Sequence, residues 1–214
     1  MRPIYKAALL GGGGLLAAWV AWGLYSKQSA ASVPYERLES FGGVEIRQYP
    51  RTVLAETNAR DQMTAFRRLF DYISGSNEPG ESVSMTAPVK STAGTDISMT
   101  APVRSESEPD GTMRMGFYLP QTYDIETAPR PTDADVHIRE VSPRTVAALQ
   151  FSWYAPDRRV RAYEKRLLGA LDTSDYDPVG EPYLHRYNDP WTPPFMRENE
   201  VAVEVESPAN STDE

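Results

Sequence analysis

A chain of 214 residues with 40% apolar and 10% aromatic residues can bury a core of its own, which excludes a largely disordered protein. The absence of cysteine excludes disulfides, thiolate metal sites and a cysteine nucleophile. A net charge of −8 argues against a nucleic-acid-binding protein, which needs a basic face. The length fits one domain with an appendage.

The basic residues are strongly skewed toward arginine, because only four of the 22 are lysine. An acidic, lysine-poor chain suits very salty surroundings, where surface carboxylates keep a protein hydrated and soluble. We therefore expect a halophilic source, although a genome rich in G and C also favours arginine over lysine.

The N-terminal segment is the first predicted element. Residues 7–25 carry no charge, and as a helix at ~1.5 Å per residue this run is just long enough to cross a bilayer core. Arg2 and Lys6 precede it, so the positive-inside rule places the rest of the chain outside the cell membrane. We expect residues 1–32 to be a membrane anchor and linker. A signal peptide cleaved within residues 26–32 is the alternative, which would give a secreted protein.

The domain that follows, residues 33–206, contains a long internal repeat. Residues 44–55 (VEIRQYPRTVLA) match residues 136–148 (VHIREVSPRTVAA) almost position by position if Ser142 is an insertion. The paired Val-x-Ile-Arg and Pro-Arg-Thr-Val spacings make coincidence less plausible than a duplication. The sequence therefore predicts two related halves.

In the first half, alternating apolar residues predict strands over residues 44–49 and 52–57. Asp61 is suited to cap a helix that Gly75 ends. Five apolar residues recur on one face of this helix: Met63, Phe66, Leu69, Phe70 and Ile73. Two further strands are expected, over residues 83–89 and from residue 113.

The second half repeats this order. Strands are expected over residues 136–141 and 145–151, and a helix from Asp157 whose inward residues are Val160, Tyr163, Leu167 and Leu171. Two strands, near residues 182–187 and 200–206, complete it. The predicted fold is therefore α+β: two β-β-α-β-β halves forming an eight-stranded, mostly antiparallel curved sheet or distorted barrel with two helices, plus the transmembrane helix.

The hexamer SMTAPV occurs twice, at residues 84–89 and 98–103. Its proline cannot donate a hydrogen bond to a sheet ladder, which favours an edge strand or a bulge. Residues 90–96 contain the glycine and aspartate of a turn. We interpret the repeat as two edge strands of a hairpin with the same bend, a structural and not a chemical feature.

An ordered set of motifs resembles the SOUL haem-binding protein family, with the doubled MTAPV similar to its prokaryotic and haloarchaeal members. The motifs are VEIRQYP, SMTAPV, GFYLP, APRPTDADVHIREV, PRTVAALQFSW and HRYNDPWTPPFMRENEVAVEV, and they span nearly all of the domain. The resemblance implies a duplicated fold related to gyrase-inhibitor-like ligand-binding domains. It also implies non-enzymatic binding of haem or another tetrapyrrole.

The resemblance places the porphyrin against the first helix and a nearby loop. On this chain the corresponding cofactor-binding residues are Met63, Phe66, Arg67, Phe70, Trp191 and Phe195. Arginine suits the carboxylates of a tetrapyrrole. For each aromatic residue the alternative is a purely structural role, with Phe66 and Phe70 in the helix core and Trp191 and Phe195 pinning the loop.

An iron ligand is not evident. Where a histidine ligand has been proposed in vertebrate relatives, the resemblance aligns it with Gln48, and an amide is a poor ligand for iron. By strand alternation we expect His137 to face solvent, and we expect His185 to be a packed or surface residue and not a ligand. Met85 and Met99 carry a thioether, but methionine at strand spacing is usually core. No metal site is predicted.

The sequence shows none of the common catalytic motifs, and we expect no enzyme. Asp133 and Asp135 form a carboxylate pair that we interpret as turn residues. Some gyrase-inhibitor-like relatives are hydrolases that use a buried glutamate, and Glu204 is the candidate here, although its spacing favours the solvent side. The second hypothesis is therefore a hydrophobic small-molecule-binding or interaction module on the same fold. Residues 207–214 are expected to be a disordered acidic tail.

Overall fold

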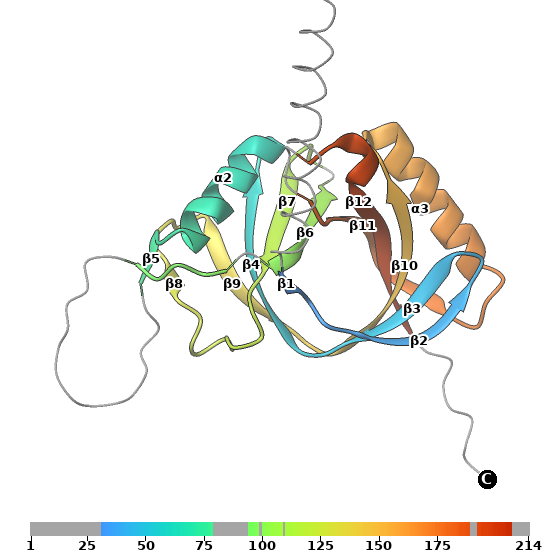
Figure 1. Ribbon diagram of the computed structural model, residues 1–214, viewed down its shortest axis with the longest axis horizontal. Helices are drawn as coiled ribbons and strands as arrows, with labels where there is room; N and C mark the ends of the chain where they lie inside the picture. Colours follow the sequence, from blue (N-terminus) through green and yellow to red (C-terminus); the bar gives the residue numbers. More distant parts are fainter. Residues whose placement is uncertain (1–30, 79–93, 99, 109, 189–191, 207–214) are drawn as a thin grey trace, which may run out of the picture.

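The computed structural model describes residues 31–78, 94–98, 100–108, 110–188 and 192–206. Within these ranges one strongly curved ten-stranded sheet carries two long helices on its outer surface (Figure 1). The strand pairs are antiparallel except for the pairing of β1 with β6. The predicted α+β class with two helices is confirmed.

The elements of the first part of the chain are β1 (Ala31–Ser32), β2 (Glu36–Phe41), β3 (Val44–Tyr49), β4 (Thr52–Ala59), α2 (Gln62–Ile73), β5 (Asn77–Glu78), β6 (Thr100–Ser107) and β7 (Met113–Tyr118). Those of the second part are β8 (Arg130–Pro131), β9 (Val136–Val141), β10 (Arg144–Ser152), α3 (Asp157–Leu171), β11 (Asp177–Arg186), the short 3-10 helix η1 (Pro194–Met196) and β12 (Glu198–Glu206). Strands β5 and β8 form a separate two-stranded pair.

The strand order supports the predicted duplication. Along the sheet the order is β2-β3-β10-β12-β11-β6-β7-β4-β9. The strands after β2 form counterpart pairs between the two halves: β3 with β9, β4 with β10, β6 with β11, and β7 with β12. When each strand is replaced by its counterpart, the order from β3 to β9 is the same order in reverse, as expected for two halves related by a twofold axis. Each half therefore places its first strand beside the second strand of the other half, and the two halves meet where β6 pairs with β11.

Helix α2 begins where the sequence predicts. The Asp61 side chain accepts a hydrogen bond from the backbone N–H of Thr64 at 2.9 Å, which satisfies one of the free donors of the first turn. Gly75, at φ +105°, follows the last turn in the left-handed conformation that glycine tolerates. The buried face consists of Ala65, Leu69, Tyr72 and Ile73. Leu69 and Ile73 are thus core residues as expected, whereas Met63 and Phe70 are not.

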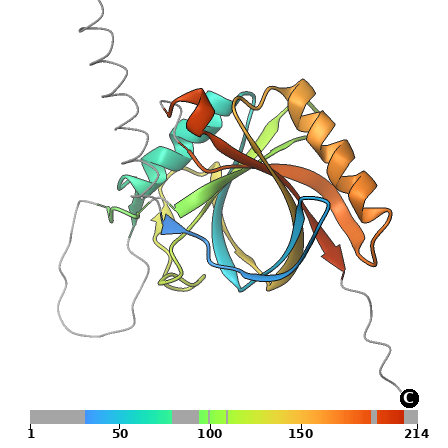
Figure 2. The ribbon, with the colours of Figure 1, turned by 45° about the vertical axis from the view of Figure 1, so that its right-hand side comes forward.

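The core consists of two outer clusters and one inner cluster. Helix α2 packs on β4, β7 and β9, and helix α3 packs on β10, β11 and β12. The predicted inward residues of α3 all contact its cluster, with Leu167 and Leu171 fully buried. The inner cluster lines the concave side of the sheet and contains Tyr49, Tyr118 and Tyr183. The inner side of the curve therefore contains the protein's own side chains. Figure 2 shows the curved sheet with both helices on its outer side.

The predicted barrel is wrong, because the sheet stays open between β2 and β9. Strand β2, which the sequence analysis missed, is an edge strand whose residues from Glu36 to Ser40 are all exposed. Charged and exposed edge residues such as Glu36, Arg37 and Glu39 discourage a further strand from pairing there. The sheet curves without closing.

The hexamer repeat is only partly visible. Its first copy lies outside the described residues, and so does Met99 of the second copy. Residues 100–103 of the second copy belong to β6, which pairs with β7 and with β11, so this copy is not on an edge strand. Pro102 lies where the β6–β7 register shifts between Thr100 and Val103. The predicted bulge is thus confirmed, and the shift explains why an interior strand tolerates a residue without an N–H.

The predicted transmembrane span, residues 7–25, also lies outside the described residues. Among the helices that the structure describes, none has both the length and the apolar character that a bilayer crossing requires. The tail, residues 207–214, is likewise outside the description.

A substitution at Gly116 on β7 tests the packing of the inner cluster. A Cβ added there would lie 2.9 Å from Cδ1 of the buried Leu54 and about 3.0 Å from two further atoms of the same side chain. We expect Gly116→Ala to lower the free energy of unfolding by about 1–3 kcal/mol, because Leu54 cannot shift without displacing its neighbours. Urea denaturation followed by circular dichroism measures this.

The matched control is Gly169→Ala on the exposed side of α3, where an added Cβ meets nothing within 4 Å. This change should raise the free energy of unfolding by about 0.5–1 kcal/mol, because alanine loses less backbone entropy in a helix. A Gly116→Ala variant as stable as the Gly169→Ala variant would contradict the packing described for Leu54.

Candidate functional site

An apolar cleft lies where α2 faces the end of β11 and the segment that leads into β12. We call it the α2 cleft; its volume is about 130 Å³. The lining residues are Gln62 and Phe66 from α2, Val103 and Met115 from β6 and β7, Trp153 and Ala155 after β10, Arg186 and Asn188, and Arg197, Glu198 and Asn199. In Figure 2 α2 and the segment before β12 lie on the same side of the sheet.

Large apolar side chains are exposed next to this cleft. On α2 these are Met63, 64% exposed, and Phe70, 46% exposed. The predicted helix face therefore divides, because Leu69 and Ile73 turn into the core while Met63 and Phe70 face solvent. Phe66 lies between the two sets: its ring stacks on Phe70 at 5.9 Å and meets the buried Phe117 edge-on at 5.5 Å.

Opposite α2, the aromatic residue that lines the cleft is Trp153, which is about half exposed. Tyr154 and Phe195 in η1 are also about half exposed but do not line the cleft. Trp153 has φ +80°, a left-handed backbone conformation that costs a bulky residue on the order of 1–3 kcal/mol. The side-chain amide of Asn199 donates to the Trp153 carbonyl at 2.8 Å and holds this conformation. Strain of this kind is concentrated at functional sites.

The other predicted binding residues are placed as follows. Arg67 is exposed on α2 and makes no ion pair with any residue that the structure describes. Its neighbour Arg68 is engaged, since its Nη2 lies 2.7 Å from Asp135. Asp133 and Asp135 occupy the turn before β9, as predicted, where the Asp135 N–H donates to the Asp133 carboxylate at 2.9 Å. Trp191 lies outside the described residues.

Neither histidine lines the α2 cleft. His137 is exposed on β9, and His185 is buried on the inner face of β11, so both predictions about their environments are confirmed. Gln48, which replaces the proposed ligand of vertebrate relatives, accepts a hydrogen bond from the Thr145 hydroxyl at 2.8 Å. The cleft therefore suits a ligand held by apolar contact and not by histidine coordination.

A network of buried charges fills the inner face of the sheet. The Arg47 guanidinium on β3 donates to both carboxylate oxygens of Glu200 on β12, at 2.8 and 2.9 Å, across the intervening β10. The Tyr187 hydroxyl donates to the same carboxylate at 2.5 Å. Burial and the Glu200 charge raise the pKa of Tyr187, and burial raises the pKa of Tyr49 to about 12. A bidentate pair of this kind fixes the spacing of the three strands.

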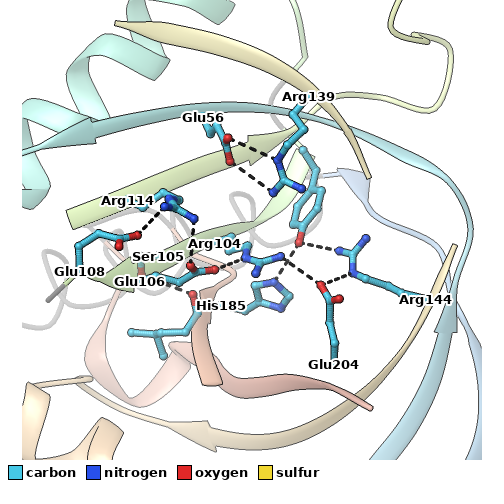
Figure 3. Close-up of polar contacts among 12 residues, drawn as sticks. Glu56, Arg104, Ser105, Glu106, Glu108, Arg114, Arg139, Arg144, His185 and Glu204 are labelled. Atoms are coloured by element: carbon cyan, nitrogen blue, oxygen red, sulfur yellow. Dashed lines mark hydrogen bonds and ion pairs between the residues drawn. The ribbon is translucent and has the colours of Figure 1, made fainter. Parts of the chain in front are cut away.

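A second part of the network surrounds the pairing of β6 with β11. Figure 3 shows Arg104 and Arg144 converging on Glu204, with N–O distances of 3.7 and 3.4 Å. Arg104 also pairs with Glu106 and lies 3.8 Å above the ring of Tyr183. These residues bring cationic groups to the buried His185.

Glu204, the sequence candidate for a buried glutamate, is not the buried carboxylate of β12. Glu204 is partly exposed, as its spacing suggested, and the buried carboxylate is Glu200. Glu200, Ala202 and Glu204 alternate on the inner face while Val201, Val203 and Val205 pack toward α3. Alternation alone could have placed Glu200 beside Glu204, but no pattern within one strand shows that Arg47 lies across from it.

His185 should make stability depend on pH. Burial, with the charges of Arg104 and Arg144, lowers the pKa of His185 well below its ordinary value of 6.5. His185 is therefore protonated near pH 6.5 in the unfolded chain but stays neutral at that pH in the folded protein. For this reason the free energy of unfolding falls as the pH drops below 6.5 toward the folded-state pKa. We expect the free energy of unfolding to decline between pH 7 and 5.5 and the decline to be smaller in His185→Gln.

The matched control is His137→Gln, which removes the exposed histidine and should leave the slope unchanged. Urea denaturation at several pH values measures both slopes. If His185→Gln and the unmodified protein lost stability equally over this range, His185 would not be neutral in the folded state.

This chain is similar to known proteins in sequence and in fold. The family model for SOUL heme-binding protein matches residues 30–204. Heme-binding protein 1 of Mus musculus is 26% identical over 188 residues, covering 84% of this chain and 88% of its own, and that of Bos taurus is 27% identical over 185 residues, covering 79% and 88%. Among solved structures, the C-terminal domain of EcmrR is similar with a TM-score of 0.48 and 11% identity, over 81% of this chain and 98% of that chain. Since the family model matches most of its length, the chain belongs to the SOUL heme-binding protein family.

Proposed function

We propose that the protein is a non-enzymatic tetrapyrrole-binding protein whose ligand lies on the α2 cleft. The observation that carries this proposal is the set of aromatic side chains at and beside one cleft: Phe66 and the half-exposed Trp153 line it, and the exposed Phe70 stacks on Phe66. Exposed large apolar residues gathered at one place mark a binding surface, whereas single ones do not.

The family supports a haem or a related ring as the ligand. The relatives from Mus musculus and Bos taurus are heme-binding proteins, and the similarity covers most of each chain. A tetrapyrrole is a flat apolar ring with carboxylates on one edge, so it needs an apolar surface with a cationic group nearby. Phe66 and Trp153, which line the cleft, offer the first, and Arg67 is an exposed cation next to Phe66 in the sequence of α2.

The size of the cleft sets how such a ligand is held. Sites that enclose a ligand of this size usually measure about 300–1,000 Å³, whereas the α2 cleft measures about 130 Å³. The exposed side chains around it must supply the remaining contact, so one part of the ring stays open to solvent. A bound haem would supply a redox-active iron, and no histidine of this chain lines the cleft to tune it.

Binding without catalysis is consistent with the contacts of Glu200, the one buried glutamate among the described residues. A catalytic base needs a carboxylate free to accept a proton. Both oxygens of Glu200 are held by Arg47, and Tyr187 donates to one of them as well. This arrangement suits a structural role for Glu200.

The alternative ligand is another apolar small molecule, or an apolar segment of a partner protein, on the same surface. The partial exposure of the site favours neither. A tetrapyrrole differs from both because its optical absorbance responds to binding, so one titration separates the hypotheses.

Titration with hemin is the direct test, carried out in molar salt because we also propose that the acidic, arginine-rich composition reflects a salt-adapted source. We expect a saturable shift of the Soret band at one hemin per chain. Phe70→Ser should weaken binding by about tenfold, because it removes a large apolar contact worth roughly 1.5–3 kcal/mol. Weak absorbance changes that never saturate would favour the alternative ligand class.

The control is Ile125→Ser, which removes an apolar side chain of nearly equal exposure, 45% against 46%, away from the cleft. It should leave the hemin affinity unchanged. Equal effects of the two substitutions would show that the loss does not come from the α2 surface.

We also propose that residues 1–32 attach the protein to the cell membrane, with the domain on the outer side. The support is the uncharged run at residues 7–25, preceded by Arg2 and Lys6. In cell fractionation, the full chain should sediment with membranes and resist alkaline carbonate, while a chain starting at Ala31 should remain in the supernatant. Recovery of a shortened chain from the medium would instead support a cleaved signal peptide.

A further inference from the structure

Arg186 is the last residue of β11 and pairs in the sheet with Val103 of β6. It lies at the junction of the two halves, on the outer face that α2 and α3 cover on either side. Arg186 is half-buried, and this burial lowers the pKa of the guanidinium, a direction that marks a cation in surroundings that disfavour its charge.

The half-buried guanidinium makes no ion pair with the described residues. Its one hydrogen bond there runs from Nη1 to the Ser105 hydroxyl at 2.6 Å. Asp157, at the start of α3, is the carboxylate whose charge reaches it, but without ion-pair contact. On the inner face, by contrast, Arg47 and Arg104 each lie within 3 Å of a carboxylate oxygen.

The position of Arg186 links two cavities. It lines the α2 cleft, and it also lines a second cleft of about 650 Å³ between α3 and strands β6, β7 and β11. Two other cations that line these cavities have partners: Arg114 pairs with Glu108 at 2.9 Å, and Arg197 donates to the Thr192 carbonyl at 2.9 Å. Arg161 lines only the wider cleft and is exposed on α3. Arg186 lines both cavities, is half-buried and makes no ion pair with the described residues.

We propose that Arg186 binds a carboxylate of the ligand, so that the site selects tetrapyrroles with free carboxylate side chains over neutral ones. This inference rests on the proposed function, because it assumes a tetrapyrrole on the α2 cleft. The ring lies against Phe66, and a carboxylate on its edge reaches the guanidinium where the two clefts meet. A guanidinium suits this role because its planar fork donates two parallel hydrogen bonds to one carboxylate.

The acidic residues of the wider cleft explain why the ligand carboxylate would bind at Arg186 and not further into that cleft. Its walls carry Asp157, Glu164 and Glu181, and burial with the nearby Glu181 charge raises the pKa of Glu164. Carboxylates so placed repel a second anion. The carboxylate edge of the ligand is thus favoured at one position, which orients the ring.

The test compares hemin with hemin dimethyl ester, whose carboxylates are blocked, on the full chain. The unmodified protein should bind hemin more tightly than the ester. Arg186→Gln should weaken hemin binding by about tenfold, the size expected for one lost charge-assisted hydrogen bond, and leave ester binding unchanged. Arg186→Lys should recover part of the loss, because lysine keeps the charge but not the fork. Arg158→Gln, at an exposed arginine outside both clefts, is the control and should bind both compounds normally.

The outcomes separate this inference from the proposed function. Saturable hemin binding that Arg186→Gln leaves intact would overturn the role of Arg186 and leave the proposed function standing. Equal weakening of hemin and ester would also overturn it, since that pattern shows damage to the cleft and not loss of a carboxylate contact. Failure of the unmodified protein to bind either compound would overturn the proposed function, and this inference with it.

A second readout needs no ligand. Because Arg186 is half-buried and makes no ion pair with the described residues, Arg186→Gln should leave the melting temperature of the ligand-free protein unchanged or raise it. A structural arginine behaves in the opposite way. A fall of more than about 4 °C, which corresponds to the loss of a stabilising contact in a domain of this size, would overturn the inference.

Discussion

A guanidinium group that leaves water needs an anion, and this requirement organises both faces of the sheet. On the inner face Arg47 and Arg104 meet carboxylates from β12 or from their own strand. The Arg47–Glu200 pair connects the first strand of one half to the last strand of the other, across β10. Loss of either partner would leave a buried charge unpaired, so the pair fixes how the two halves meet.

The same requirement distinguishes the outer face. There the two helices cover the sheet with apolar side chains, and the gap between them contains a half-buried arginine whose described hydrogen bond goes to a hydroxyl group. The proposed ligand, which is both apolar and anionic, would pair with this arginine and cover the aromatic residues beside it.

The repeat and the strand periodicity were enough to predict much of the fold. Residues 44–49 and 136–141 were predicted as strands with the bounds that the structure shows, and α3 begins at the predicted Asp157. These predictions depend on local patterns of period 2 or 3.6. Closure of the sheet depends instead on what the two edges do. The edge strand β2 carries no apolar alternation, so local periodicity could predict neither its presence nor the open sheet.

The candidate site was predicted less completely, for a related reason. The apolar spacing on α2 identified Phe66 but could not separate core positions from exposed ones, because Met63 and Leu69 fit the same helical pattern. Trp153 and Arg186 reach the cleft from separate strands and were missed. What assigns a role to Arg186 is that it makes no ion pair with the described residues, although Glu198 lines the same cleft, and this arrangement in space leaves no pattern in the sequence.

The duplication also explains why the site occurs once. Both helices occupy equivalent places on the sheet, yet the α2 surface next to the gap is aromatic, whereas α3 presents arginine and glutamate there. Each helix must bury one face to hold its half of the sheet, and this need fixes only that face. The residues on the other face are not fixed by this need, and on α2 they include apolar side chains. The fold therefore needs both halves equally, because they exchange strands, while the proposed binding surface needs the side chains of α2 and the junction where β11 ends.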